Sequence, residues 1–178
     1  KLFFQHLVFT FGFFIFPNEE YFTSIKAFQD KYTNITPIRN LAFKQNVDLF
    51  GGHQFFPIDK KFKVNAIFKE TPSLAVLNTS TSRLAEYTKL GVLEFQLEGK
   101  TFQLAVFYSD GYAKDDEYAD KAFVPFMDLT NAEIRTPTAD IAMYNCQKNG
   151  EEVILDFNKA TNPYCAYVSG YSCARPPE

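Results

Sequence analysis

The side chains that could carry acid–base chemistry are few and lie far apart in the sequence. The chain has two histidines, and His53 follows two glycines in "GGHQFFPID", where a sharp turn could display a general base. A lone histidine is more often an ordinary loop residue. Asp59, Asp128 and Asp156 each lie at or near the end of an expected strand, a frequent position for catalytic carboxylates. His53, Asp128 and Asp156 are therefore the candidates for catalysis, although no spacing brings any two of them together.

Asp156 has a competing structural interpretation. The string "ILDFN" places its charge between apolar residues, so the carboxylate either faces outward or accepts hydrogen bonds from nearby backbone amides. Asp156, Asn158 and Asn162 carry acceptors and donors that suit the backbone groups of the irregular segment after them. We expect these three residues to form a structural clasp, and we favour that role over catalysis.

The three cysteines favour a structural bridge over a metal site. Seven residues separate Cys165 and Cys173, and a disulfide between them would fix a loop-rich segment if the compartment is oxidising. Metal binding would need further ligands, and the chain has no paired-cysteine or His-x-x-x-His spacing. Cys146 is then expected to be a small buried hydrophobe. We therefore predict a Cys165–Cys173 disulfide, no metal and no cofactor.

Composition and periodicity predict the elements that hold these residues. Hydrophobic residues make up 46% of the 178 residues, and 21 Phe with 10 Tyr suit strands better than helices. Tyr21, Phe22, Ile25, Phe28 and Tyr32 recur at helical spacing, which predicts one amphipathic helix from the cap Asn18 to about Thr33. The expected fold is mainly β (α+β): an antiparallel sheet, barrel-like or a sandwich, with one N-terminal helix.

Alternation of apolar and polar residues locates the strands. Residues 61–68 form one expected strand, and residues 93–97 and 102–106 around Gly99 form a β-hairpin. Shorter strands are expected at 123–127, where Pro125 suggests an edge or a bulge, and at 153–157. Residues 109–120 read as a polar surface loop, and the last twenty residues as an irregular C-terminal arm.

The beginning of the chain is the most hydrophobic part. Leu2 to Phe16 is almost wholly apolar, like the hydrophobic stretch of an export signal, but it is short for a transmembrane helix. We divide the chain into a signal-like or anchoring segment, residues 1–17, and a single β-rich domain, residues 18–178. Burial of the segment in the fold is the alternative. The expected partner of Leu2 to Phe16 is a protein or a membrane, at the cell envelope after export.

Charge argues against one class of partner. The net charge is −3, and the longest basic run is the pair Lys60 and Lys61, so nucleic-acid binding has no electrostatic support. No small-molecule ligand can be assigned from the sequence.

Four strings in the second half of the chain resemble one family. "FFPIDKKFKV", "LGVLEFQLEGKTFQLAVF", "FVPFMDLTN" and "VILDFNKATNPYCAYVSGYSC" occur in the order seen in the DUF1684 family, over about Leu49 to Glu178. In form the chain is similar to members from Bacteroidota, many of which carry export signals. The resemblance implies a β-rich domain and no established activity.

One departure from that family concerns its best candidate site. The family has a "TYGGGRY" stretch whose glycine amides and arginine suit an anion. This chain has "AEIRTPTADIAMYNCQK" at residues 132–148, without a glycine, so Arg135 cannot be equated with the family arginine. The expectation is a non-enzymatic accessory or binding domain of a membrane-associated complex; the alternative is a hydrolase-like or anion-binding enzyme that uses carboxylates near the sheet.

Overall fold

The computed structural model describes residues 17–34, 55–108, 121–128, 139–145, 149–167 and 170–177. One α-helix and seven strands are found in these ranges, and every strand pairing is antiparallel. Their bounds are α1 Pro17–Asn34, β1 Lys63–Asn78, β2 Leu84–Leu97, β3 Lys100–Tyr108, β4 Lys121–Phe126, β5 Ala139–Asn145, β6 Glu152–Asp156 and β7 Ala160–Thr161. The predicted β-rich fold with a single N-terminal helix is confirmed.

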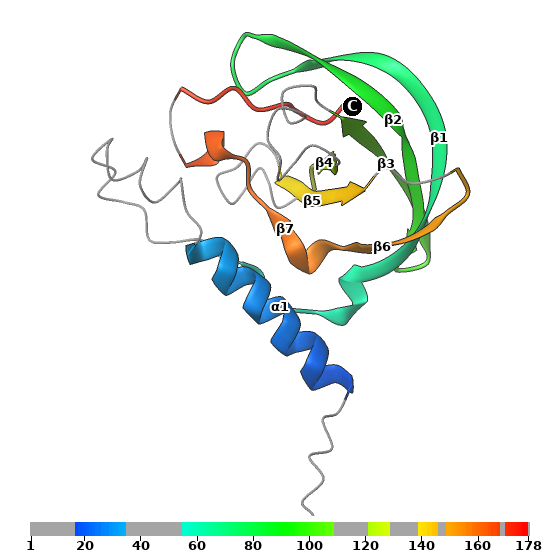
Figure 1. Cartoon of the computed structure of the whole chain (residues 1–178), viewed down its shortest axis with the longest axis vertical. Coiled ribbons are helices and arrows are strands. Elements are labelled where there is room, and N and C mark those ends of the chain that lie inside the picture. Colours follow the sequence, from blue (N-terminus) through cyan, green and yellow to red (C-terminus); the bar gives the residue numbers. More distant parts are fainter. Residues whose placement is uncertain are drawn as a thin grey trace, which may run out of the picture.

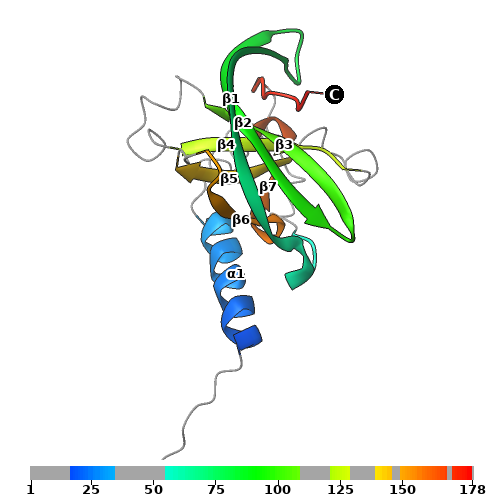
Figure 2. The ribbon, with the colours of Figure 1, turned by 90° about the vertical axis from the view of Figure 1, so that its right-hand side faces the viewer.

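The sheet curls so that its two end strands meet. Its strand order is β6-β1-β2-β3-β4-β5-β7, and β6 and β7 are joined in the chain by the short 3-10 helix η3, Phe157–Lys159. The ribbon accordingly bends β1 and β2 around one side and places β5 and β7 opposite them (Figure 1). Helix α1 lies outside the curl, below β6 and β7, in both views (Figure 2). We call β6, η3 and β7 together, residues 152–161, the closing segment. The result is a barrel-like sheet with helix α1 against this closing segment.

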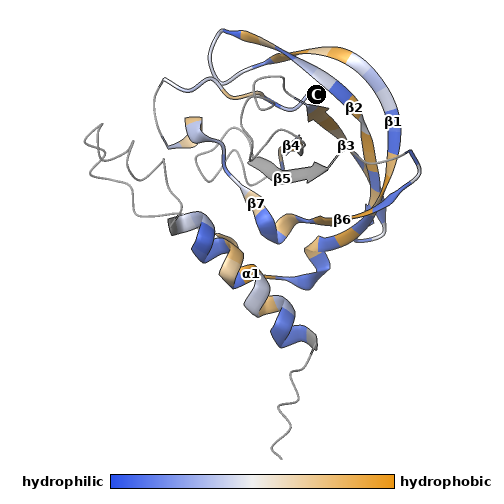
Figure 3. Ribbon diagram, viewed as in Figure 1, coloured by the Kyte–Doolittle hydropathy of each residue, from blue (hydrophilic) through white to orange (hydrophobic). Residues whose placement is uncertain are grey.

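The core lies inside the curl. Hydrophobic and polar residues alternate along β1 and β2, as Figure 3 shows. One buried cluster consists of Ala66, Phe68, Leu93, Phe95, Val106, Ala122, Val124, Val153 and Leu155. Phe157 of η3 packs against this cluster and lies 5.6 Å from the Phe95 ring and 5.3 Å from the Phe126 ring, centroid to centroid. Since Phe95 is on β2 and Phe126 on β4, the closing segment helps to fill the core it encloses.

The hairpin predicted around Gly99 is confirmed. β2 and β3 pair from Leu97 with Lys100 onward, and both turn residues, Glu98 and Gly99, have positive φ, as a two-residue type I′ turn requires. The strands run further than predicted. β1 continues to Asn78 and β2 begins at Leu84, because a register shift between Glu70 and Ser73 absorbs the break in alternation at Thr71-Pro72.

Helix α1 differs from the expected helix in two details. It begins one residue before Asn18, at Pro17. Proline suits the first turn because it has no backbone N–H that would need a partner there. Its buried side chains are Tyr21, Ile25 and Gln29, four residues apart, whereas Phe22 is exposed. The apolar spacing therefore located the helix but placed Phe22 on the wrong face.

The strand at 123–127 is also adjusted. β4 ends at Phe126 and lies between β3 and β5, so Pro125 is not on an edge strand. Its pairing with β5 shifts register between Ala122 and Val124, and its strand pairing with β3 is limited to Phe107 opposite Phe123. Pro125 is tolerated because the ladder on its β3 side does not extend that far.

Candidate functional site

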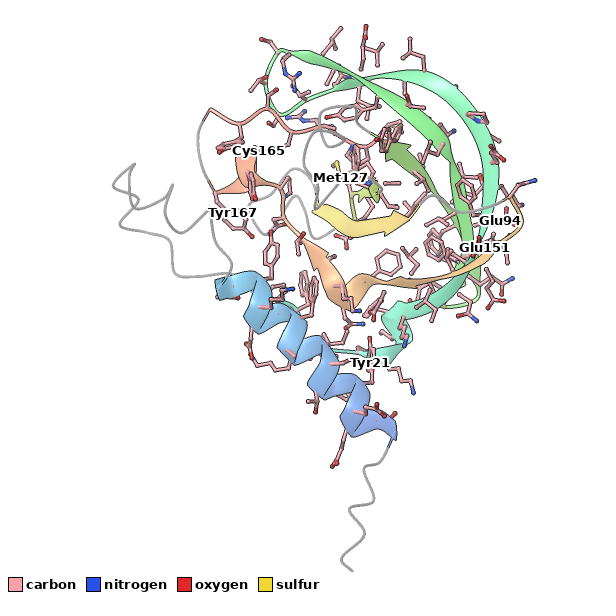
Figure 4. All side chains as sticks on the ribbon, viewed as in Figure 1. Tyr21, Glu94, Met127, Glu151, Cys165 and Tyr167 are labelled. Carbon is pink, nitrogen blue, oxygen red and sulfur yellow. The ribbon has the colours of Figure 1, made fainter. Side chains whose placement is uncertain are left out.

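A buried carboxylate lies where α1 meets the closing segment of the sheet. Asp156 is the last residue of β6 and only 5% exposed. The Tyr21 hydroxyl, on α1, lies 3.0 Å from its Oδ1 and 3.1 Å from its Oδ2 and donates to this carboxylate. Tyr21 is labelled in Figure 4, on the side of α1 that faces the sheet. A buried charge needs such donors, because its loss of hydration is otherwise uncompensated.

Asn158 completes the arrangement. Its Nδ2 lies 2.9 Å from the Tyr21 hydroxyl oxygen, 2.9 Å from the Asp59 carbonyl oxygen and 3.0 Å from Asp156 Oδ1. Its own Oδ1 accepts from the Asp59 amide at 2.8 Å, and its backbone N–H donates to Asp156 Oδ1 at 3.1 Å. We call Tyr21, Asp59, Asp156 and Asn158 the polar junction. It joins α1, the segment before η1 (Lys60–Phe62) and the end of β6.

The electrostatics of the polar junction favour a protonated tyrosine. Burial raises the pKa of Tyr21 well above its ordinary value, and the hydrogen bond and charge of Asp156 raise it further; the Asn158 hydrogen bond opposes this and the Asp59 charge adds to it. Lys63 Nζ lies 5.0 Å from the centroid of the Tyr21 ring, within cation–π range. The Tyr21 hydroxyl therefore remains a donor at neutral pH.

The third residue of the expected clasp lies further along the same helix. The Tyr32 hydroxyl donates to the Asn162 carbonyl at 3.3 Å, and Asn162 Nδ2 donates to the Tyr167 hydroxyl at 3.1 Å. Burial raises the pKa of Tyr167, and the hydrogen bond from Asn162 opposes that rise. Gln29, between Tyr21 and Tyr32 on α1, donates to the Asn158 carbonyl at 3.5 Å. Asp156, Asn158 and Asn162 are thus brought to one helix, and their role as a clasp remains a prediction.

The catalytic candidates occupy unlike environments. Asp128 follows β4 and is exposed, whereas Asp156 is buried in the polar junction. His53 and Cys146 lie outside the described residues, as does Arg135. An open hollow on the outer face of β1, β2 and β3 is lined by Lys63, Val64, Asn65, Ile67, Glu94, Phe95, Gln96 and Thr101. Its lining includes neither Asp128 nor Asp156, so this hollow does not assemble the residues predicted for catalysis.

Cys165 and Cys173 lie close together but are not joined by a disulfide in the structure. The Cys165 backbone N–H donates to Cys173 Sγ at 3.4 Å, so the arm folds back to bring the two residues into contact. The predicted bridge is not confirmed and remains a prediction. Cys165 and Tyr167 appear together on the arm in Figure 4.

A second polar cluster, missed from the sequence, holds the end of the arm. Thr79 Oγ1, 3% exposed as a residue, donates to the Arg83 carbonyl at 2.6 Å and lies 2.7 Å from Ser172 Oγ. Arg83 donates through Nε to Ser172 Oγ at 3.2 Å and through its guanidinium to the Ser172 carbonyl at 3.1 Å. Thr81 Oγ1 also lies 2.7 Å from Ser172 Oγ. We call Thr79, Thr81, Arg83 and Ser172 the tip–arm cluster, since it joins the β1–β2 turn to the arm.

Neither a metal-binding group nor a membrane-spanning helix is found in the ranges that the structure describes. Within those ranges, no group of three or more His, Cys, Asp or Glu side chains could hold a metal ion. Over the same part of the chain, no helix combines the length and the apolar character needed to cross a membrane.

The fold and the polar junction define a small antiparallel β-domain closed by its C-terminal segment. The profile described as "Protein of unknown function (DUF1684)" matches residues 48–178, and the chain belongs to this family. A similar solved structure is the solution NMR structure of the uncharacterized protein from gene locus rrnAC0354 of Haloarcula marismortui. It is 28% identical with a TM-score of 0.61, and the match covers 90% of this chain and 88% of that one. No curated protein matches the chain.

Proposed function

We propose that this chain is a non-enzymatic accessory or binding domain of a membrane-associated complex at the cell envelope, attached through Leu2 to Phe16. The observation that carries the proposal is the burial and hydrogen bonding of Asp156, the candidate carboxylate that stands out most in the sequence. It is buried, and its oxygens accept hydrogen bonds from Tyr21 and Asn158. A general base must reach a substrate proton, and this carboxylate instead holds a helix against a sheet.

The apolar beginning of the chain supplies the attachment. Leu2 to Phe16 is interrupted only by Gln5, His6, Thr10 and Gly12, and it directly precedes α1. A stretch of this hydropathy needs a lipid or protein environment. Because the polar junction and Asn162 hold α1 at two points, a membrane or partner bound to Leu2 to Phe16 would be coupled to the closing segment of the sheet.

Vesicle flotation tests the attachment. The full chain, the chain without residues 2–16, and a full-length control with Phe9→Lys and Phe13→Lys are each mixed with vesicles of phosphatidylethanolamine and phosphatidylglycerol. We expect the full chain to float, the deletion to remain in the dense fraction while keeping its thermal midpoint, and the double substitution to bind weakly. A full chain that stays in the dense fraction, or a deletion that no longer folds, would contradict the attachment.

A second measurement separates this function from the hydrolase-like alternative. The Asp128→Asn and Asp156→Asn variants are compared with the parent chain in ester, phosphoester and glycoside hydrolysis. The proposal expects the parent and both variants to be indistinguishable from buffer. Turnover that Asp128→Asn abolishes in a folded protein would favour the enzyme.

A further inference from the structure

Among the described residues, the outer edge of β1 is covered near both ends of the strand but not between them. Near its start, β6 pairs with Lys63 to Ile67, and the Glu151 carbonyl and the Gly150 amide bond to the backbone of Phe68. Near its end, the Arg175 amide donates to the Asn78 carbonyl. Among the described segments, none places a backbone hydrogen bond on this edge from residue 71 to residue 77.

The register shows which backbone groups face that edge. The Asn78 carbonyl points away from β2, toward the arm, and backbone groups alternate sides along a strand. Leu74 and Val76 therefore direct their N–H and C=O groups outward, whereas Ala75 and Leu77 bond to β2. The outer face of the same stretch is apolar, because the Leu74 residue is 74% exposed and the Val76 residue 54%.

Residues 73–77 of this edge carry none of the features that usually protect a strand edge. Charged side chains, prolines and bulges normally prevent edge strands from pairing with other chains. From Thr71 to Ser82 the chain has no charged residue. Pro72 and the register shift beside it end the open stretch on one side, and the arm ends it on the other. What remains is a short, neutral strand edge with two outward-facing apolar side chains.

We propose that this edge is a homodimer interface, at which the β1 strands of two copies pair antiparallel about a two-fold axis at Ala75. Leu74 then lies opposite Val76 of the second copy, and the two Leu74–Val76 pairs exchange four backbone hydrogen bonds. This edge is a different surface from Leu2 to Phe16, through which the proposed function attaches the chain.

The edge is complementary to itself. Because no charge lies between Thr71 and Ser82, two-fold pairing places no like charges opposite one another. The four apolar side chains of the two pairs all fall on the outer face, and Leu84, 61% exposed and opposite Asn78, adjoins Val76 diagonally. A two-fold contact uses the edge of each copy once, so the pairing closes as a dimer and does not extend into a fibre.

Amide hydrogen exchange across a dilution series tests the interface on the full chain. At high concentration, we expect the Leu74 and Val76 amides to exchange at least about tenfold more slowly than at high dilution. The Ala75 and Leu77 amides, which bond to β2, should be protected at every concentration and act as internal controls. This readout is local, so association through Leu2 to Phe16 cannot imitate it.

A substitution pair then identifies the edge. Val76→Lys places a charge on the exposed face of the edge and should raise the dimer dissociation constant at least about tenfold by sedimentation equilibrium. Met127→Lys, at a residue that is also 54% exposed but follows β4, should leave it unchanged. Fast exchange of both amides at all concentrations, slow exchange at all concentrations, or a dimer unaffected by Val76→Lys would each overturn the proposal. If Val76→Lys fails to fold, the exchange pattern of the parent chain decides.

Discussion

The polar junction and the tip–arm cluster fasten opposite ends of the molecule by different means. The polar junction encloses a carboxylate: Asp156 is 5% exposed, and Tyr21 and Asn158 supply its donors. The tip–arm cluster joins the β1–β2 turn to the arm mainly through hydroxyl groups. Its single charged side chain, Arg83, belongs to an exposed residue. Both clusters link a chain segment to the sheet through several hydrogen bonds.

The difference between the clusters lies in what breaking them leaves behind. Removing a donor from the polar junction leaves a charged oxygen buried without a hydrogen-bond partner. The loss of stability is then much larger than for a neutral hydrogen bond that water can replace. The number of hydrogen bonds is therefore a poor guide to the stability of either region. Burial and charge predict instead that the polar junction is the stronger of the two.

Asn158→Ala should give the largest effect. It removes donors from Asp156 and from the Asp59 carbonyl and leaves the Asp59 amide without its acceptor. We expect the free energy of unfolding to fall by about 3 kcal/mol. Urea denaturation measures the change, with Asn65→Ala, an exposed asparagine on β1, as the matched control. Equal losses of stability from the two substitutions would show that the hydrogen bonds of Asn158 contribute no more than an exposed asparagine does.

Cys173→Ser tests whether a disulfide makes the arm region as stable as the polar junction. If Cys165 and Cys173 form a bridge in oxidising buffer, the arm is held covalently beside the tip–arm cluster. The substitution should then lower the free energy of unfolding by about 2–3 kcal/mol in oxidising buffer. In reducing buffer the change should be far smaller. Mass spectrometry of unreduced peptides identifies the bridge, and its absence after oxidation would show that the region relies on hydrogen bonds alone.

Tyr21→Phe should lower the free energy of unfolding by about 2 kcal/mol at neutral pH, since a hydrogen bond to a buried carboxylate is lost. It should also change the pH dependence. The pKa of Tyr21 is raised in the folded state, so its stabilisation is fully present below the unfolded pKa of about 10 and is lost as pH rises above that value. The parent chain should therefore lose stability more steeply above about pH 10 than Tyr21→Phe. Parallel profiles would contradict this assignment.

Thr79→Val should have the smallest effect of the four. It removes the hydroxyl that bonds to the Arg83 carbonyl and contacts Ser172 Oγ, but it strands no charge. We expect a loss of about 1 kcal/mol by thermal and urea denaturation. Thr88→Val, at an exposed threonine on β2, is the control and should be close to neutral. A loss as large as that of Asn158→Ala would show that charge is not what separates the two clusters.

The sequence predicted what depends on local pattern. Alternation around Gly99 located the β2–β3 hairpin, and four-residue spacing located α1. Alternation did not reveal that β1 continues past Phe68 or that β2 begins well before Leu93, since the register shift between Glu70 and Ser73 reverses the pattern there. β5 and β7 were missed as well; β7 has only two residues, too few to show any period.

The residues of the candidate site were likewise predicted only in part. Asp156 and Asn158 were identified because a charge inside an apolar string needs a partner. Tyr21, which supplies that partner, was read only as part of an apolar helix face, since no local signal connects it with a residue so distant in the sequence. Thr79 and Ser172 were missed because their hydroxyl groups gain meaning only when the arm returns to the β1–β2 turn.

The joining of β6 to β7 through η3 has a consequence for synthesis on the ribosome. Both ends of the sheet are completed by residues 152–161, which pair Lys63 with Asp156 on one side and Asp140 with Thr161 on the other. Chains are made from the N-terminus, so β1 to β5 emerge before either pairing can form. A ribosome that stalls before Glu152 would leave β1 without β6 and β5 without β7, so both edges could pair with neighbouring chains on a polysome.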